Sequence, residues 1–191
     1  MILFLKMNYV FMICVYCIYI YSYRSNIGVT YAGLGADFRV LTRKGRKSAQ
    51  KYFLQYRDPQ PVSQLVREVA STVQEFTQSG GVRPFGVSLF IAGYDDQGPQ
   101  LYQVDPSGSY WAWKASAMGE NATNAKTILS KRYSPDMDIE DAISHAIKTL
   151  KEDFQGELNE KNIEIGVVGV DRVFKVLSED EVRDYVEESL F

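Results

Sequence analysis

The sequence predicts an α+β fold in which two β-sheets pack face to face between pairs of helices. Helix-like and strand-like segments come in groups, in the order strand, two helices, three strands, two helices, two strands and helix. Short clusters of Gly, Pro, Asp and Ser separate these segments. The 191 residues are 46% hydrophobic and 24% charged, which is ordinary for one globular domain. Grouped elements favour stacked layers over strict alternation of strands and helices.

A buried strand and a helical hairpin are expected first. Residues 27–31 are apolar and rich in β-branched side chains, and they lead into a glycine turn around Gly33. A helix is expected over residues 37–56, with Asp37 as its N-cap. A second helix is expected over residues 62–78, because apolar side chains recur there at spacings of three and four.

The rest of the chain is expected to contain five strands and three helices. Turn sequences, a Ser-Pro break and a capping box made by Ser178 and Glu181 set their limits. The strands are expected at residues 86–94, 100–105, 109–118, 163–170 and 172–177, and the helices at residues 121–133, 138–154 and 178–188. The first three of these strands follow one another through tight turns, so they predict an antiparallel meander.

Residues 1–25 differ from the rest of the sequence. Residues 9–21 are all apolar or aromatic, but this run is shorter than the roughly 18 residues of a membrane-spanning helix, and tyrosines are spread along it. A secretory signal is a second interpretation, under which Asn121 would be a glycosylation acceptor, although no small-residue cleavage site precedes Arg24. We favour an alternative or mispredicted start, because the composition changes abruptly at about Asn26.

Composition argues against several classes of function. The net charge of -3 and the pI near 5.3 give no reason to expect a nucleic-acid partner, which requires a basic excess. Both cysteines, Cys14 and Cys17, lie near the start, which suits a reducing compartment. Their spacing is half of a zinc site, but there is no second pair and the single histidine is His145, so we expect no metal. His145 flanks the apolar stripe of its helix and is assigned no role.

The strongest local charge feature is a basic run in the first expected helix. Nucleic-acid binding and nuclear import are two interpretations, but no aromatic platform or nucleic-acid motif accompanies the run, so a solvated or protein-binding face is favoured. The run consists of Arg39, Arg43, Lys44, Arg46, Lys47 and Lys51. Neighbouring carboxylates such as Asp95 and Asp96 fall in turns, where Asp is favoured for its backbone geometry, and they indicate no acid–base chemistry.

The chain lacks the nucleophile arrangement of a self-processing hydrolase. Such an enzyme uses Thr, Ser or Cys at a processed start, with the free amine as base. No glycine–threonine junction precedes a strand near the start of this sequence. Thr30 lies inside the first expected strand and would need cleavage after Val29, for which the sequence shows no signal. We therefore expect no catalytic residues.

Three motifs in the middle of the chain carry a specific resemblance. They are Glu75-Phe-Thr-Gln-Ser-Gly-Gly-Val-Arg-Pro-Phe-Gly86, Tyr102-Gln-Val-Asp-Pro-Ser-Gly108 and Lys114-Ala-Ser-Ala-Met-Gly119. With these motifs, residues 26–191 resemble the domain of the alpha-type subunits of the 20S proteasome, most closely the type-2 subgroup. The resemblance implies an N-terminal-nucleophile-hydrolase-like four-layer α-β-β-α sandwich, with the first helical hairpin facing the catalytic beta ring and the second helix pair on the opposite side.

The resemblance also implies a function. It implies a non-catalytic structural and gating subunit of the alpha ring, in support of ubiquitin-dependent protein degradation. The implied partners are other alpha subunits, beta subunits and regulatory particles, with no nucleic acid, membrane or cofactor, and the implied location is cytoplasmic and nuclear. Gly33 matches the glycine that, in the family, lines an inter-subunit pocket for the C-terminal tails of activators.

The start of the chain departs from the family pattern. The gate segment, the first strands and a lysine that completes the activator pocket are not recognisable before Asn26. We therefore expect a sandwich without its N-terminal strands, with an unpaired sheet edge and exposed core surface that hinder folding or entry into the ring. Two alternatives stay open: a self-processing hydrolase of the same fold that would use Thr30, and a membrane-tethered interaction protein that would use residues 1–25.

Overall fold

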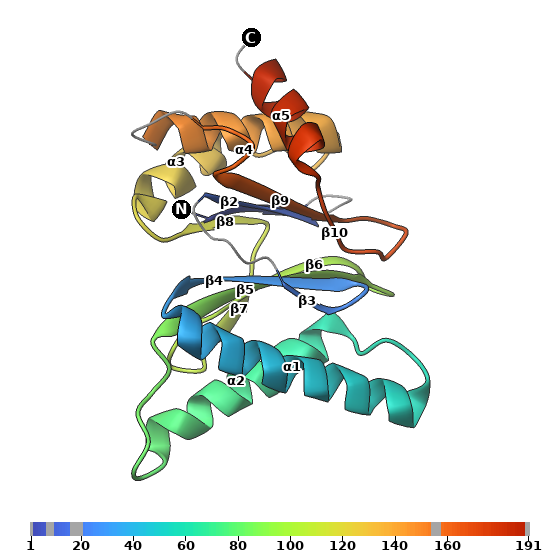
Figure 1. Ribbon diagram of the computed structural model, residues 1–191, viewed down its shortest axis with the longest axis vertical. Coiled ribbons are helices and arrows are strands. Elements are labelled where there is room, and N and C mark those ends of the chain that lie inside the picture. Colours follow the sequence, from blue (N-terminus) through green and yellow to red (C-terminus); the bar gives the residue numbers. More distant parts are fainter. Residues whose placement is uncertain (1, 7–9, 16–20, 154–157, 190–191) are drawn as a thin grey trace.

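The computed structural model describes residues 2–6, 10–15, 21–153 and 158–189. These residues form four layers, with helices on the outer faces of two stacked β-sheets (Figure 1). The layers confirm the expected α+β sandwich. Within the described ranges, no helix combines the length and the apolar character that crossing a membrane requires.

One sheet has the strand order β3-β4-β5-β6-β7, and all neighbouring strands are antiparallel. Its strands are β3 (Tyr21–Arg24), β4 (Ile27–Gly33), β5 (Val87–Asp95), β6 (Gly98–Val104) and β7 (Tyr110–Ala112). The register of β4 against β5 runs from Ile27 opposite Gly93 to Gly33 opposite Val87. Since most residues of β4 and β5 are buried, these two strands form the centre of the sheet, and β5, β6 and β7 form the expected meander.

The other sheet has the strand order β10-β9-β2-β1-β8 and is also antiparallel. Its strands are β1 (Ile2–Lys6), β2 (Val10–Val15), β8 (Ala115–Met118), β9 (Ile163–Val168) and β10 (Lys175–Val176). β2 lies beside β9, with Val10 opposite Val168 and Val15 opposite Ile163. β1 lies beside β8, with Ile2 opposite Met118. The first two strands of the chain therefore connect β8 to β9.

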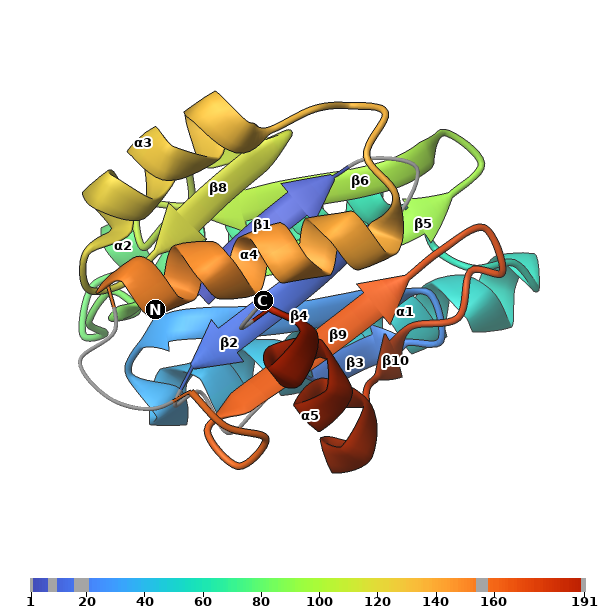
Figure 2. The same ribbon diagram turned by 90° about the horizontal axis from the view of Figure 1, so that it is seen from above.

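The helices cover the outer faces of both sheets (Figures 1 and 2). α1 (Gly35–Tyr56) and α2 (Val62–Gln78) lie on the β3–β7 sheet, and α3 (Ala122–Arg132), α4 (Ile139–Asp153) and α5 (Glu179–Glu188) lie on the other. α2 buries six apolar residues at the spacing that predicted it: Val62, Leu65, Val66, Val69, Ala70 and Val73. The expected capping box is present, because the side chains of Ser178 and Glu181 each bond to the other's backbone N–H.

Three buried apolar clusters fill the three spaces between the layers. Representative members are Phe38, Leu65 and Ile91 between α1–α2 and their sheet, Val10, Phe90 and Met118 between the two sheets, and Ile13, Ile143 and Ile165 below α3, α4 and α5. Val10 and Ile13 belong to different clusters, although both lie in β2. Residues separated by an odd number of positions point to opposite faces of a strand, so β2 contributes to the core on both sides.

The expectation that the N-terminal strands are missing is wrong. β1, β2 and β3 all lie within residues 2–24 and pair with strands of the domain. Val10 and Ile13 are 0% exposed, so β2 lies inside the sandwich and covers the sheet that was expected to be open. The segment is rich in Ile, Val, Phe and Tyr, which fit a pleated and buried surface. Whether residues 1–25 come from an alternative start stays a prediction.

Two other boundaries differ from the expected ones. The expected strand at residues 109–118 is two strands, β7 and β8, which belong to different sheets. The chain crosses between the sheets near Trp113, whose backbone N–H donates to the backbone carbonyl of Leu101 at 2.9 Å. The last expected strand is shortened to Lys175–Val176. No Gly, Pro, Asn or Asp interrupts residues 109–118, so the sequence contains no turn signal at the crossing.

Replacing Ile13 with Ala tests whether β2 is part of the core. We expect the free energy of unfolding to fall by about 2–5 kcal/mol, because a fully buried Ile would be replaced by a cavity. Urea denaturation followed by circular dichroism measures the change. Val170→Ala is the control, because Val170 is 67% exposed and its truncation should have little effect. Equal midpoints for the Ile13 variant and the native chain would show that β2 is not buried as described.

Candidate functional site at the start of helix α1

The turn between β4 and α1 is pressed against the backbone that leads into β5. Gly33 has φ of 128°, a conformation that side-chain-bearing residues rarely adopt. A Cβ at this position would lie 2.4 Å from the carbonyl oxygen of Gly86. The N–H of Leu34 donates to the same oxygen at 2.9 Å. Both the backbone angle and this close approach therefore require glycine at position 33.

Leu34 is the N-cap of α1, so the expectation that Asp37 caps the helix is wrong. The helix begins at Gly35, and no side chain caps it. Leu34 is 53% exposed, whereas residues on either side of it are packed together. The ring of Tyr31 in β4 stacks on the ring of Phe38 in α1, with the ring centroids 4.1 Å apart. The turn thus presents one exposed apolar side chain on a rigid base.

Asp37 connects the first turn of α1 to the segment before β5. Its carboxylate accepts two bonds from the Arg83 guanidinium, at 2.7 Å to Oδ2 and 2.8 Å to Oδ1. Oδ2 also accepts the N–H of Gly86 at 2.9 Å. These bonds explain why Asp37 does not cap its own helix, since its oxygens are used by residues that follow α2. A carboxylate in the first turn is also favoured by the helix dipole.

The electrostatics of this cluster favour an ionised Asp37 at neutral pH. The hydrogen bond from Arg83, followed by the bond from the Gly86 amide, lowers the pKa of the Asp37 carboxyl from 3.8 to about 2. The Asp37 side chain is 9% exposed, and its partner Arg83 is largely exposed. A carboxylate held in this way makes a poor general acid or base near neutral pH, so the site is suited to binding and positioning instead of proton transfer.

Thr30 lies in the middle of β4 and is 0% exposed. It is opposite Phe90 of β5, inside the sheet. Its hydroxyl has no hydrogen-bond partner among the described residues. A nucleophile of the self-processing kind needs a free amine and access to substrate, and a central strand position offers neither.

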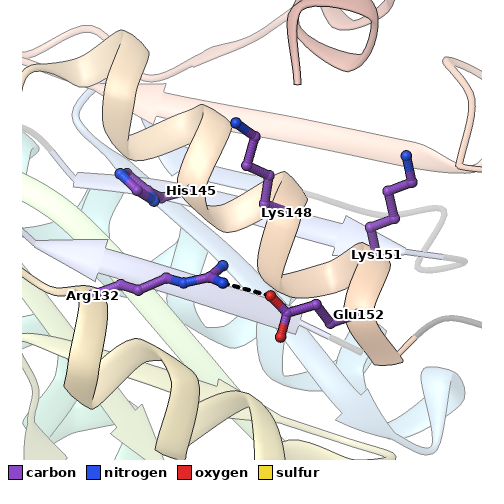
Figure 3. A pocket seen from close by; sticks show the side chains of 5 residues that line it. All are labelled: Arg132, His145, Lys148, Lys151 and Glu152. Carbon is purple, nitrogen blue, oxygen red and sulfur yellow. Dashed lines mark hydrogen bonds and ion pairs between the residues drawn. The ribbon is translucent and has the colours of Figure 1, made fainter. Parts of the chain in front are cut away.

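His145 and Cys14 lie on elements away from the α1 site. His145 is half-buried on α4 and lines an open pocket with Arg132 and Lys148 (Figure 3). Cys14 lies in β2 opposite Glu164, and Cys17 lies outside the described residues. Within the part of the chain that the structure describes, no three His, Cys, Asp or Glu side chains gather where they would hold a metal ion.

The basic run lies on the solvent-facing side of α1. All six of its residues are exposed, and the ammonium of Lys44 lies 4.8 Å from the centre of the Phe76 ring. Asp95, which was expected to serve turn geometry, accepts the N–H of Val62 at 3.0 Å and that of Gln97 at 2.9 Å. Asp96 pairs with Arg172 at 2.7 Å. These carboxylates therefore have structural roles.

Arg83 and Gly86 are site residues that local sequence patterns do not predict. Both lie within the motif that carries the family resemblance, but their contacts are with a residue 46 to 49 positions earlier in the chain. Turn and cap signals act over a few residues, so they could not connect Asp37 to Arg83. The available signal was the motif itself, which places an arginine directly before Pro84.

Known proteins resemble this chain over most of its length. The profile of a protein family described as "Proteasome subunit" matches residues 16–168. Proteasome subunit alpha type-2-A of Arabidopsis thaliana is 66% identical over 163 residues, which are 85% of this chain and 69% of the relative. Proteasome subunit alpha type-2 of Oryza sativa subsp. japonica is 64% identical over 169 residues, 88% of this chain and 72% of the relative. The alpha type-2 subunit of Drosophila melanogaster is 54% identical over 162 residues, 85% of this chain and 69% of the relative.

Gly33→Ala tests the constraint at the turn. We expect it to destabilise the chain by more than Gly81→Ala, because Gly81 also has positive φ but nothing lies within 4 Å of the added Cβ. The Gly81 change should cost about 1–2 kcal/mol for backbone strain alone, and the Gly33 change should add the clash with Gly86. Thermal or urea unfolding of both variants measures the difference. Equal losses would show that the close approach at Gly33 is absent.

Asp37→Asn tests the ion pair and its pH dependence. We expect a loss of about 2 kcal/mol at neutral pH, because the charge-assisted bonds to Arg83 are removed. The folded-state pKa of Asp37 is below its unfolded value, so its contribution is complete above about pH 4 and is lost as the pH falls towards 2. Unfolding measured between these pH values should therefore show a smaller fall for the variant than for the native chain.

The control for Asp37 is Asp136→Asn, which changes an exposed carboxylate. This control should keep both the native stability and the native pH dependence. If Asp37→Asn showed the same acid profile as the native chain, the lowered pKa would be contradicted.

Proposed function

This chain belongs to the proteasome subunit family, and we propose that it acts as a non-catalytic structural and gating subunit of the 20S alpha ring, in support of ubiquitin-dependent protein degradation. The single observation that carries the proposal is the extent of the similarity to alpha type-2 subunits, at 54–66% identity over most of the chain. Two stacked sheets between helix layers also supply the body that such a subunit needs.

The chain is a non-catalytic member of its family. Its relatives are alpha-type subunits, and the proteolytic activity of the complex resides in the beta subunits. The position of Thr30 agrees with this role, because its strand is paired on both sides, with β3 and with β5. The self-processing alternative would require a new amine at Thr30, and cleavage there would separate β1, β2 and β3 from the domain.

The proposed binding element is the glycine turn at the start of α1. Gly33 corresponds to the family position that lines the pocket for activator tails, and the tight contact with Gly86 fixes its backbone. Exposed Leu34 lies directly beside it. A rigid turn costs little conformational entropy on binding, which favours recognition of a flexible C-terminal tail. The pocket would be completed by a neighbouring subunit.

The proposed partners are the other alpha subunits, the beta subunits and the regulatory particles, and the proposed location is the cytoplasm and the nucleus. By similarity to the family, α1 and α2 would face the beta ring. Their hairpin presents a broad exposed face that includes Val40 and Leu54, at 45% and 67% exposure. Exposed apolar side chains beside the basic run suit a protein interface more than a free helix surface.

Assembly is the direct test of the proposed function. Expressed with the remaining alpha and beta subunits of a plant relative, the tagged chain should co-sediment with the assembled particle. The isolated chain should hydrolyse no proteasome peptide substrate, and Thr30→Ala should change nothing. A folded chain that stays in the light fractions would contradict the ring assignment. Peptide hydrolysis that Thr30→Ala abolishes would establish the hydrolase alternative, and carbonate-resistant retention in membranes would establish the tethered one.

Leu34→Asp tests the proposed activator contact without straining Gly33. We expect particles that contain this variant to assemble normally but to respond less to activators, because a charge would replace the apolar side chain beside the turn. Stimulation of peptide hydrolysis by an activator measures the response. Val170→Asp is the control, since Val170 is 67% exposed but lies outside both the turn and the α1–α2 hairpin. Equal stimulation of both variants would exclude a contact at Leu34.

A further inference from the structure

A basic pocket lies between the ends of α3 and α4, on the helix layer opposite α1 and α2. It is an open basin of about 470 Å³ lined by Arg132, His145, Lys148, Lys151 and Glu152 (Figure 3). Arg132 comes from the last turn of α3, and the other four residues come from α4. The pocket is far from the residues of the α1 turn, since two sheets separate the two helix layers (Figure 1).

The lining carries an excess of positive charge. Arg132, Lys148 and Lys151 each contribute one positive charge and Glu152 contributes one negative charge, which leaves an excess of two. By contrast, a cavity of about 180 Å³ beside Asp95 is lined by three carboxylates and the cation Arg172. The basic character is therefore a property of this pocket and not of the chain, whose net charge is -3.

One ion pair joins the two helices that form the pocket, and it does not involve the lysines. Arg132 Nη2 bonds to Glu152 Oε1 at 2.6 Å, which joins the end of α3 to the end of α4. Glu152 lies four residues after Lys148, a spacing at which helical side chains often pair, but its carboxylate bonds to Arg132. Among the described residues, neither Lys148 nor Lys151 has an ion-pair or hydrogen-bond partner.

Two half-buried residues of the pocket have a side-chain nitrogen without a partner among the described residues. Lys148 and His145 lie on the boundary of the α4 core face, next to the buried residues Ala146, Ile147 and Thr149. The Nδ1 atom of His145 is buried without a hydrogen-bond partner among the described residues. An ammonium group without an ion-pair partner among the described residues is stabilised by a nearby anion, so a negatively charged ligand would complement the pocket.

We infer that this pocket binds a phosphate group, held by Lys148 and Lys151, whose side chains extend to the same side of α4 (Figure 3). A phosphate monoester carries a charge of about −1.5 to −2 at neutral pH, which matches the excess of two positive charges. Arg132 lies on the other side of α4, where its charge is balanced by Glu152, so the two lysines supply the excess positive charge (Figure 3). The basin exceeds by far the about 15 Å³ that one water needs, so it also has room for the group that carries the phosphate.

His145 provides a direct probe, because it is the only histidine of the chain. Its imidazole proton resonances can be followed by NMR in the full-length native protein while ligand is added. The probes are inorganic phosphate, the peptide Ala-Ala-phosphoserine-Ala-Ala and the same peptide without phosphate, all at one fixed pH and ionic strength. We expect saturable shifts with the first two probes and none with the third.

The two phosphate sources are distinguished by their affinities. Tighter binding of the phosphopeptide assigns the pocket to a phosphorylated side chain, and tighter binding of inorganic phosphate assigns it to the free ion. Both results support a phosphate site. The absence of a saturable shift with either probe overturns it.

Charge-removing variants identify the residues that bind. The double variant Lys148→Gln and Lys151→Gln should weaken phosphate binding at least tenfold. The control is Lys47→Gln with Lys51→Gln, which removes two exposed charges from α1 and should leave the affinity unchanged. Circular dichroism and the unbound His145 resonances establish that each variant is folded. Native affinity in the α4 variant, or equal loss in both double variants, contradicts the assignment.

Discussion

The β1–β2 pair holds together the sheet with the order β10-β9-β2-β1-β8. In the described strand order, this pair is the only connection between β8 and β9. β8 has β1 as its partner, and β9 would otherwise have only the short strand β10. Buried backbone groups without partners are costly, so both strands depend on this insertion. Val10 and Ile13 extend the dependence to the core, since one packs between the sheets and the other packs below the helices.

The turn between β4 and α1 depends on the other sheet, β3-β4-β5-β6-β7. β4 delivers Gly33 to the contact with Gly86, and Arg83 binds Asp37 from the segment that leads into β5. Two segments far apart in the sequence are thus locked together where α1 begins. This rigidity, with Leu34 exposed beside it, is what makes the turn suitable for binding a tail. The proposed phosphate pocket is built differently, by an ion pair between two helix ends beside two lysines that have no ion-pair partner among the described residues.

Local patterns predicted much of this fold because they report burial and chain reversal. The apolar spacing of residues 62–78 predicted α2 at its observed limits, and Ser178 with Glu181 predicted the start of α5. The same patterns failed where the cause is distant in sequence. They placed Asp37 as a cap because its partner Arg83 is remote, and they missed the change of sheet near Trp113. The N-terminal strands were missed because a uniformly apolar run does not reveal which residues alternate between two buried faces.

Amide hydrogen exchange of β9 tests the central claim most directly. If β2 fills the sheet, the amides of Ile163–Val168 that bond to β2 should exchange only through global unfolding, with protection equal to that of β5. The amides of β10, which has β9 as its partner strand, should exchange sooner. Exchange of these β9 amides at the rate of an exposed turn such as residues 96–97, in a chain whose β5 stays protected, would contradict the account.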